Sequence, residues 1–202
     1  MALDSELFDA HMDDPSTLSM LLKGHLWLEH ALARSIGIAL KDAAKLDVDR
    51  MSFSGKIDLV LASGALPSEF ESPLRCVNKV RNRSAHDLDF RLTESEVERL
   101  TDSLSGLART AFERIHDDDD DVRTTLRRWL HAVLFCIEWI NLGAEYSKVN
   151  RRALDTYSII RALEERSGGV VDDDALRKKY GVPPEPTPAD VWTVPHMTSN
   201  AR

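Results

Sequence analysis

Three residues near the middle of the chain have side chains suited to cleaving a phosphodiester bond. Arg81, Asn82 and His86 lie in the short segment RNRSAH, residues 81–86. A guanidinium group can bind a phosphate through paired hydrogen bonds and stabilise added negative charge. An imidazole can take a proton from a ribose 2′-hydroxyl or give one to a leaving oxygen. This chemistry needs no metal ion or other cofactor. Metal-independent cleavage of RNA is therefore one interpretation, with Asn82 positioning the pair or the substrate.

Whether Arg81 and His86 can act together on one phosphate depends on where their helix ends. On an ideal α-helix, Arg81 and His86 point about 140° apart and do not share a face. We expect the helix to end near Ala85, which would leave His86 at a frayed C-terminus and free to turn back toward Arg81. The negative end of the helix dipole would favour a protonated imidazole there. The alternative is structural, because arginine and histidine also serve as capping residues at a helix C-terminus.

Other cations surround the pair in a chain that is acidic as a whole. Lys79 and Arg83 point off the Arg81 face, and they are either surface charges or contacts to RNA phosphates. With Arg75 and Arg91 they form the one strongly basic stretch before the acidic run at 117–121. The formal net charge of -8 argues against broad nonspecific binding of nucleic acid, although it leaves room for a small local site.

The periodicity of apolar residues predicts an all-α protein. Apolar residues recur every three or four positions, and no segment alternates as a strand would. Residues 1–14 are expected to form a loose acidic lead-in. A helix should then open at Pro15, Ser16 and Thr17, and Thr93 and Glu96 form a capping box for a later one. Helices are expected over residues 18–40, 53–64, 73–85, 93–115, 122–140, about 153–160 and 174–180. These elements suggest three parts: a helical bundle over 1–116, a helical extension over 117–182, and a flexible proline-rich tail over 183–202.

Composition and cysteine usage indicate the class of protein. Hydrophobic residues make up 43% of the chain and charged residues 30%, as in soluble globular proteins. No apolar run is long enough for a membrane span, and the acidic N-terminus does not resemble a secretory signal. Cys76 and Cys136 lack metal-type spacing and are expected to be reduced thiols in a cytoplasmic protein. The aspartates of 117–121 are expected to form a solvated loop whose last carboxylates favour the next helix.

Three segments in order resemble the HEPN superfamily of α-helical domains. These are GHLWLEHAL, FSGKIDLVLASGAL and LRCVNKVRNRSAHD, and they are most similar to its mannitol-operon-repressor-like branch. The similarity covers about residues 18–107. Its defining motif is an arginine followed after four to six residues by a histidine, often with a polar residue after the arginine, as in Arg81, Asn82 and His86. The resemblance implies an up-down helical bundle that dimerises and brings two such motifs together in one cleft.

The resemblance also bears on two supporting residues. Glu29 falls where related domains often carry an acidic residue near the arginine, so it either orients Arg81 through a bidentate contact or is a partly exposed glutamate at the bundle edge. His25, on the same stripe, is expected to be a satisfied core or interface histidine. Members regulated by a nucleotidyltransferase antitoxin often carry a tyrosine two residues after the histidine. This chain has Leu88 there, so regulation by modification at that site is not expected.

Two functions follow as expectations. The first is a metal-independent HEPN-type endoribonuclease, such as a toxin or antiphage effector, that cleaves RNA in a homodimer cleft and has an antitoxin or regulatory protein as a further partner. The second is a non-catalytic helical regulator or adaptor that acts through protein–protein contacts. In the second case Arg81 and His86 would serve the dimer interface, and the extension after residue 122 would be a surface for a partner.

Overall fold

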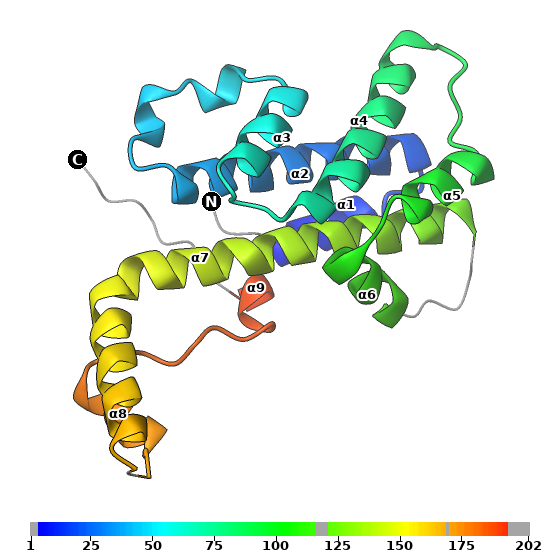
Figure 1. Cartoon of the computed structure of the whole chain (residues 1–202). Coiled ribbons are helices and arrows are strands. Elements are labelled where there is room, and N and C mark those ends of the chain that lie inside the picture. The colour runs from blue at the N-terminus through cyan, green and yellow to red at the C-terminus, as the bar shows by residue number, and fades with distance from the viewer. Residues whose placement is uncertain (1–3, 116–120, 169, 194–202) are drawn as a thin grey trace.

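A computed structural model describes residues 4–115, 121–168 and 170–193, and it confirms that the described chain is all-α, with no strand in these ranges. Figure 1 shows the arrangement of the helices. In chain order they are α1 (Ser5–Met12), α2 (Thr17–Ala39), α3 (Phe53–Ala62), α4 (Glu71–His86), α5 (Glu94–Asp102), α6 (Gly106–Arg114), α7 (Val122–Arg166), α8 (Asp173–Lys179) and α9 (Asp190–Thr193), with short 3-10 turns at Ala43–Lys45, Val48–Arg50 and Ser68–Phe70.

Side-chain caps begin several of the helices at the residues where the sequence placed them. The Ser16 hydroxyl accepts a hydrogen bond from the Ser19 amide at 3.2 Å and opens α2. The capping box of α5 is confirmed, because the Thr93 amide donates to the Glu96 carboxylate at 2.9 Å and the Thr93 side chain binds the backbone in return. Such local contacts satisfy the free amides of a first helical turn.

The N-terminal residues form a helix rather than the expected loose lead-in. The Asp4 carboxylate accepts from the Leu7 amide at 3.0 Å and caps α1. Phe8 and Met12 are fully buried, and the Phe8 ring meets the Trp27 ring edge-on at 5.7 Å between centroids. The prediction failed because a two-turn helix with only two core-facing residues leaves little periodic signal among acidic neighbours.

The helix expected over 93–115 is broken into α5 and α6. At the break, Gly106 has a φ of +51°, a conformation that other residues rarely adopt. The carboxylate of Glu69 lies directly against Gly106 and accepts a hydrogen bond from the Leu107 amide at 2.9 Å. A side chain at residue 106 would collide with this carboxylate. The break is therefore held by a contact from a residue 38 positions away in sequence.

One continuous helix, α7, replaces the two predicted over 122–140 and 153–160. It begins where Asp121 accepts from the Thr124 amide at 2.6 Å, as expected for the last carboxylate of the acidic run. The other aspartates of that run lie outside the described residues. Figure 1 shows α7 running below α2 and then bending, so that its last turns project away from the bundle beside α8.

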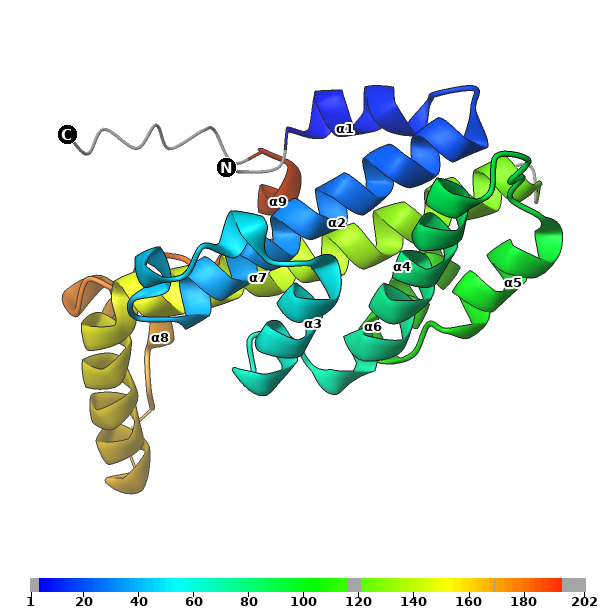
Figure 2. The same ribbon diagram turned by 90° about the horizontal axis from the view of Figure 1, so that it is seen from above.

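The main core extends across the predicted boundary between 1–116 and 117–182. Figure 2 shows α2 and α7 side by side, with α3 and α4 crossing them. From α7, Leu126, Trp129 and Ile137 are fully buried in the same core as Leu28 and Leu74. A second, smaller cluster joins Tyr157, Leu176 and Val182 in the projecting part. The first half of the extension is thus part of the bundle itself.

Part of the predicted flexible tail is anchored to the fold. The Tyr146 hydroxyl donates to the Pro183 carbonyl at 2.7 Å, and Val191 of α9 is buried. The remaining tail residues, 194–202, lie outside the described part of the chain.

Candidate functional site

Helix α4 ends one residue later than expected, and this decides where the two candidate catalytic side chains lie. Asp87 is the C-cap, and its amide donates to the Arg83 carbonyl at 3.0 Å. The Asp87 carboxylate then accepts from the Asp89 amide at 3.0 Å and turns the chain away. His86 is therefore the last helical residue. It keeps its helical direction, about 140° from that of Arg81, instead of turning back toward it.

Arg81 lies half-buried on the side of α4 that faces α2. Its Nη1 donates to the Asn82 Oδ1 at 3.3 Å. It also lies near His25, which is 4% exposed and has its Nε2 within 3.4 Å of the Asn78 Oδ1. The His25 ring lies 4.0 Å from the Phe53 ring, measured between centroids. These contacts agree with the prediction of a satisfied core histidine.

Burial lowers the pKa of His25 below its ordinary value. Loss of water is the main cause, and the positive charges of Arg81 and Lys56 act in the same direction. The Asn78 hydrogen bond and the Glu29 charge oppose the change. His25 is therefore held as a neutral imidazole beneath Arg81.

The ion pair that Glu29 makes is with Lys56 of α3. The Glu29 Oε1 accepts from the Lys56 ammonium at 2.6 Å, and Lys56 itself is 3% exposed. In the described part of the chain no ion pair joins Glu29 to Arg81. A buried ammonium needs a nearby carboxylate, and Glu29 takes this role for Lys56 of α3.

His86 and Asn82 line an open groove between α4 and α5. The groove has a volume of ≈ 620 Å³, and its lining includes Lys79, Arg83 and Arg99. Arg83 forms an ion pair with the Glu96 carboxylate, which is 6% exposed and belongs to the capping box of α5. A shallower depression of ≈ 490 Å³ shares Arg83 and Arg99 with the groove. The groove therefore collects both predicted phosphate contacts, Lys79 and Arg83, around the imidazole.

Two charged residues of α5, Glu96 and Arg99, also line the groove and were not predicted as site residues. Arg99 lies opposite α4, three residues after Glu96 on the same face of α5. In the sequence, the capping box marked Glu96 as a residue of the first helical turn. Arg99 follows Glu96 by three residues, and this helical spacing was the signal that could have placed Arg99 beside it. Glu96 holds Arg83 in place, whereas Arg99 adds a positive charge to the groove.

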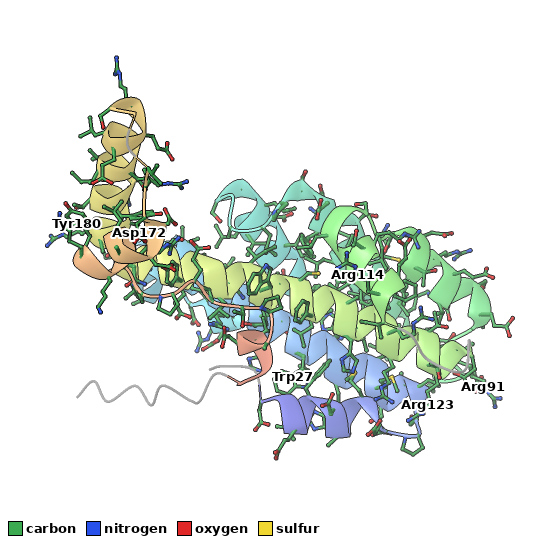
Figure 3. All side chains as sticks on the ribbon, turned by 90° about the horizontal axis from the view of Figure 1, so that it is seen from below. Trp27, Arg91, Arg114, Arg123, Asp172 and Tyr180 are labelled. Atoms are coloured by element: carbon green, nitrogen blue, oxygen red, sulfur yellow. The ribbon has the colours of Figure 1, made fainter. Side chains whose placement is uncertain are left out.

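Several cations at this end of the molecule have no carboxylate partner among the described residues. In the described part of the chain, no ion pair engages the side chains of Lys79, Arg81, Arg91 or Arg99, whereas Arg34, Arg75 and Arg177 each pair with two carboxylates. Figure 3 shows Arg91 reaching outward at the edge of the molecule. Unpaired cations attract an anionic ligand more strongly than paired ones.

Burial affects the protonation of both cysteines. Burial raises the pKa of Cys76, which lines the groove, and raises that of Cys136 to about 12. Both thiols are free and stay protonated at neutral pH. Among the described residues, no group of three or more histidine, cysteine or acidic side chains is arranged to hold a metal ion.

Comparison of the chain with protein-family models, with curated proteins and with solved structures finds no match. The HEPN resemblance therefore stays an interpretation of the sequence. Within the described ranges, no helix combines the length and apolar character needed to cross a membrane.

Proposed function

We propose that this protein is a metal-independent, HEPN-type endoribonuclease built on an up-down helical bundle. The observation that carries the proposal is the end of α4, where Arg81, Asn82 and His86 lie among cations without carboxylate partners in the described chain. The HEPN resemblance assigns catalysis to the same residues. The free thiols favour a cytoplasmic enzyme, and a toxin or antiphage effector controlled by a regulatory protein fits these features.

The active site would form between two copies of the chain. Arg81 and His86 of one chain point to different sides of α4, so a single chain does not offer both groups to one phosphate. A second copy packed across α4 would set its own Arg81 near the first His86. Leu22 and Leu26 of α2 are 38% and 54% exposed, and they follow the same helical rows as His25 and Glu29. These two leucines would supply apolar contact beside the shared site.

The proposed reaction is an internal transesterification of RNA. The ribose 2′-oxygen bonds to the adjacent phosphorus, and the bond from phosphorus to the 5′-oxygen breaks. One imidazole takes the 2′-hydroxyl proton, and the 5′-oxygen leaves with a proton from the second imidazole or from water. Arg81 stabilises the charge on the phosphoryl oxygens, and Asn82 positions Arg81. The products carry a 2′,3′-cyclic phosphate, or its hydrolysed form, and a 5′-hydroxyl.

The test is cleavage of single-stranded or transfer RNA by the purified full chain in the presence of EDTA. We expect His86→Ala and Arg81→Ala each to lower the cleavage rate by about 100-fold or more, because each removes proton transfer or charge stabilisation. His30→Ala and Arg50→Ala are matched controls, since both residues are exposed and distant in sequence from α4. Cleavage that persists in His86→Ala, or an inert wild type, would overturn the proposal.

A non-catalytic regulator or adaptor is the second candidate. The observation that favours it is the divergence of Arg81 and His86 within one chain, together with the pairing of Glu29 with Lys56 rather than with Arg81. In that case the wild type would not cut RNA. The Arg81→Ala and His86→Ala variants would weaken only self-association, which sedimentation equilibrium measures directly.

A further inference from the structure

The projecting half of α7 carries an exposed stripe that no described element covers. Its residues recur at steps of three, four, three, four and three. We call the set the distal stripe: Val149, Arg152, Thr156, Ile159, Leu163 and Arg166. Val149, Ile159 and Leu163 are 79%, 62% and 57% exposed. Steps of three and four place residues on one side of a helix, in the pattern that a partner helix contacts.

Helix α8 lies on the other side of α7. Its Leu176 packs with Tyr157 of α7, and Tyr157 also donates to the Asp173 carboxylate at 2.5 Å. Tyr157 and Ile159 are two residues apart, which turns their side chains about 160° from each other on a helix. In Figure 3, Asp172 and Tyr180 mark the α8 side of this projecting part. The second core cluster therefore leaves the distal stripe in solvent.

The same side of α7 is covered by α2 within the bundle. Glu138, Asn141 and Glu145 precede the stripe at steps of three and four, and all three contact α2. Arg34 pairs with Glu138 and, at 2.6 Å, with Glu145. The Asn141 side chain donates to the Ala31 carbonyl at 3.2 Å. The distal stripe thus continues an existing helix–helix interface.

This interface stops because α2 ends at Ala39. The Lys148 ammonium donates to the Ile38 carbonyl at 2.8 Å and closes the end of α2. A cavity of ≈ 530 Å³ opens at this point, lined in part by Ile38, Glu145 and Val149. A helix that lies along the stripe would begin near this cavity, next to the end of α2.

Charge identifies the kind of helix that fits. Arg152 and Arg166 lie on the stripe, the stripe contains no carboxylate, and no ion pair engages either arginine in the described chain. Within the bundle the polarity is the reverse, because there α2 supplies the arginine and α7 the glutamates. If two copies of the stripe packed together, each arginine would lie opposite an apolar residue or another arginine. A second copy of this chain is therefore a poor occupant.

We propose that the distal stripe is the docking surface for an acidic amphipathic helix of another protein. The apolar face of that helix would cover Val149, Ile159 and Leu163, and its flanking carboxylates would pair with Arg152 and Arg166. This inference does not depend on RNA cleavage. It holds or fails equally for an enzyme and for an adaptor.

The test uses the full chain and a fluorescent synthetic helix that carries leucine at heptad positions a and d and glutamate at e and g. We expect binding by fluorescence anisotropy, and we expect Ile159→Glu and Leu163→Glu each to weaken it about tenfold or more. Val170→Glu is the matched control. Val170 is also exposed, at 102%, but it lies after the end of α7. Arg152→Glu should weaken binding of the glutamate peptide and strengthen binding of the same peptide with lysine at e and g.

Three outcomes would overturn the proposal. The first is equal affinity of wild type and Ile159→Glu for the acidic peptide, including no binding by either. The second is a wild-type homodimer that Ile159→Glu dissociates in sedimentation equilibrium, which would make a second copy the occupant. The third is binding of wild type to phosphatidylserine vesicles with no preference for the acidic peptide, which would make the stripe a lipid-binding surface. Circular dichroism checks that the variants keep their helix content.

Discussion

At the scale of single residues, burial and pairing separate structural side chains from candidate functional ones. His25 and Glu29 lie on one stripe of α2, yet each is satisfied inside the fold, by Asn78 and by Lys56. Arg81 is half-buried near His25, and His86 is exposed at the end of α4. The polar contacts beneath Arg81 fix the position of α4 relative to α2 and α3, whereas the exposed groups above it are available to a ligand.

Neutral His25 should make the stability of the fold depend on pH. Its folded-state pKa is lowered, so the unfolded chain binds more protons than the folded chain at mildly acidic pH. The contribution of His25 is therefore fully present above its unfolded pKa, near 6.5, and is lost as the pH falls through the folded pKa. The slope from this one group is at most about 1.4 kcal/mol per pH unit.

Denaturant unfolding of wild type and His25→Gln between neutral and mildly acidic pH measures this effect. Glutamine keeps a polar partner for Asn78 but does not titrate. We expect the free energy of unfolding to fall more steeply with acidification in wild type than in His25→Gln. His30→Gln, an exposed histidine on the same helix, should retain the wild-type slope. Identical slopes in wild type and His25→Gln would show that His25 does not carry the effect.

At the scale of helices, the contact between α2 and α7 organises the bundle. Gly24 lies where α2 meets Leu130 of α7, and a Cβ atom there would come within 2.5 Å of the Leu130 Cδ1. Leu130 is 1% exposed and has little room to move. The Arg34 ion pairs and the hydrogen bond from Ser35 to Asn141, at 2.7 Å, extend this contact toward the end of α2. Gly24 therefore permits the close approach of the two helices.

Replacing Gly24 with alanine tests this close approach. Alanine gains up to about 1 kcal/mol in helix propensity, while overpacking a core costs about 1–3 kcal/mol. Because the collision is with a buried side chain, we expect Gly24→Ala to lower the free energy of unfolding by about 1–2 kcal/mol. In Gly37→Ala, on the same helix, the new Cβ meets nothing within 4 Å, so stability should rise. The denaturant midpoints of the two variants and wild type measure these changes in stability. Stabilisation by Gly24→Ala would contradict the close contact between Gly24 and Leu130.

At the scale of the whole molecule, two hydrophobic clusters divide the chain differently from its sequence segments. The main core takes residues from α1 through the first half of α7, and the small cluster ties the end of α7 to α8. The bundle therefore includes part of the predicted extension. The projecting part that remains carries the distal stripe, and the α4 groove belongs to the bundle.

This division predicts how fragments of the chain will fold. Fragment 1–116 lacks Leu126, Trp129 and Ile137, which are fully buried in the main core, so we expect it to lose cooperative unfolding. Fragment 1–150 keeps these residues and should unfold in a single transition. Thermal denaturation followed by circular dichroism distinguishes the two. Cooperative unfolding of fragment 1–116 would show that the first half of α7 is dispensable for the core.

Local patterns in the sequence were sufficient for much of this fold. The all-α class, the helices α2, α3 and α4, the start of α2 near Ser16 and the capping box at Thr93 depend on residues within a few positions of one another. The burial of His25 also followed from its place on the apolar stripe of α2. Such features are readable because helical hydrogen bonds and caps are themselves local.

Only the tertiary structure decided the features that depend on distant contacts. Glu69 breaks the predicted helix at Gly106, Lys56 takes the carboxylate of Glu29, and the core buries Phe8 of an unexpected helix. The direction of His86 turned on whether α4 ended before or after it. These outcomes are set by the competition of residues far apart in sequence for the same partner or the same space. The periodicity and spacing of residues in the sequence do not reveal that competition.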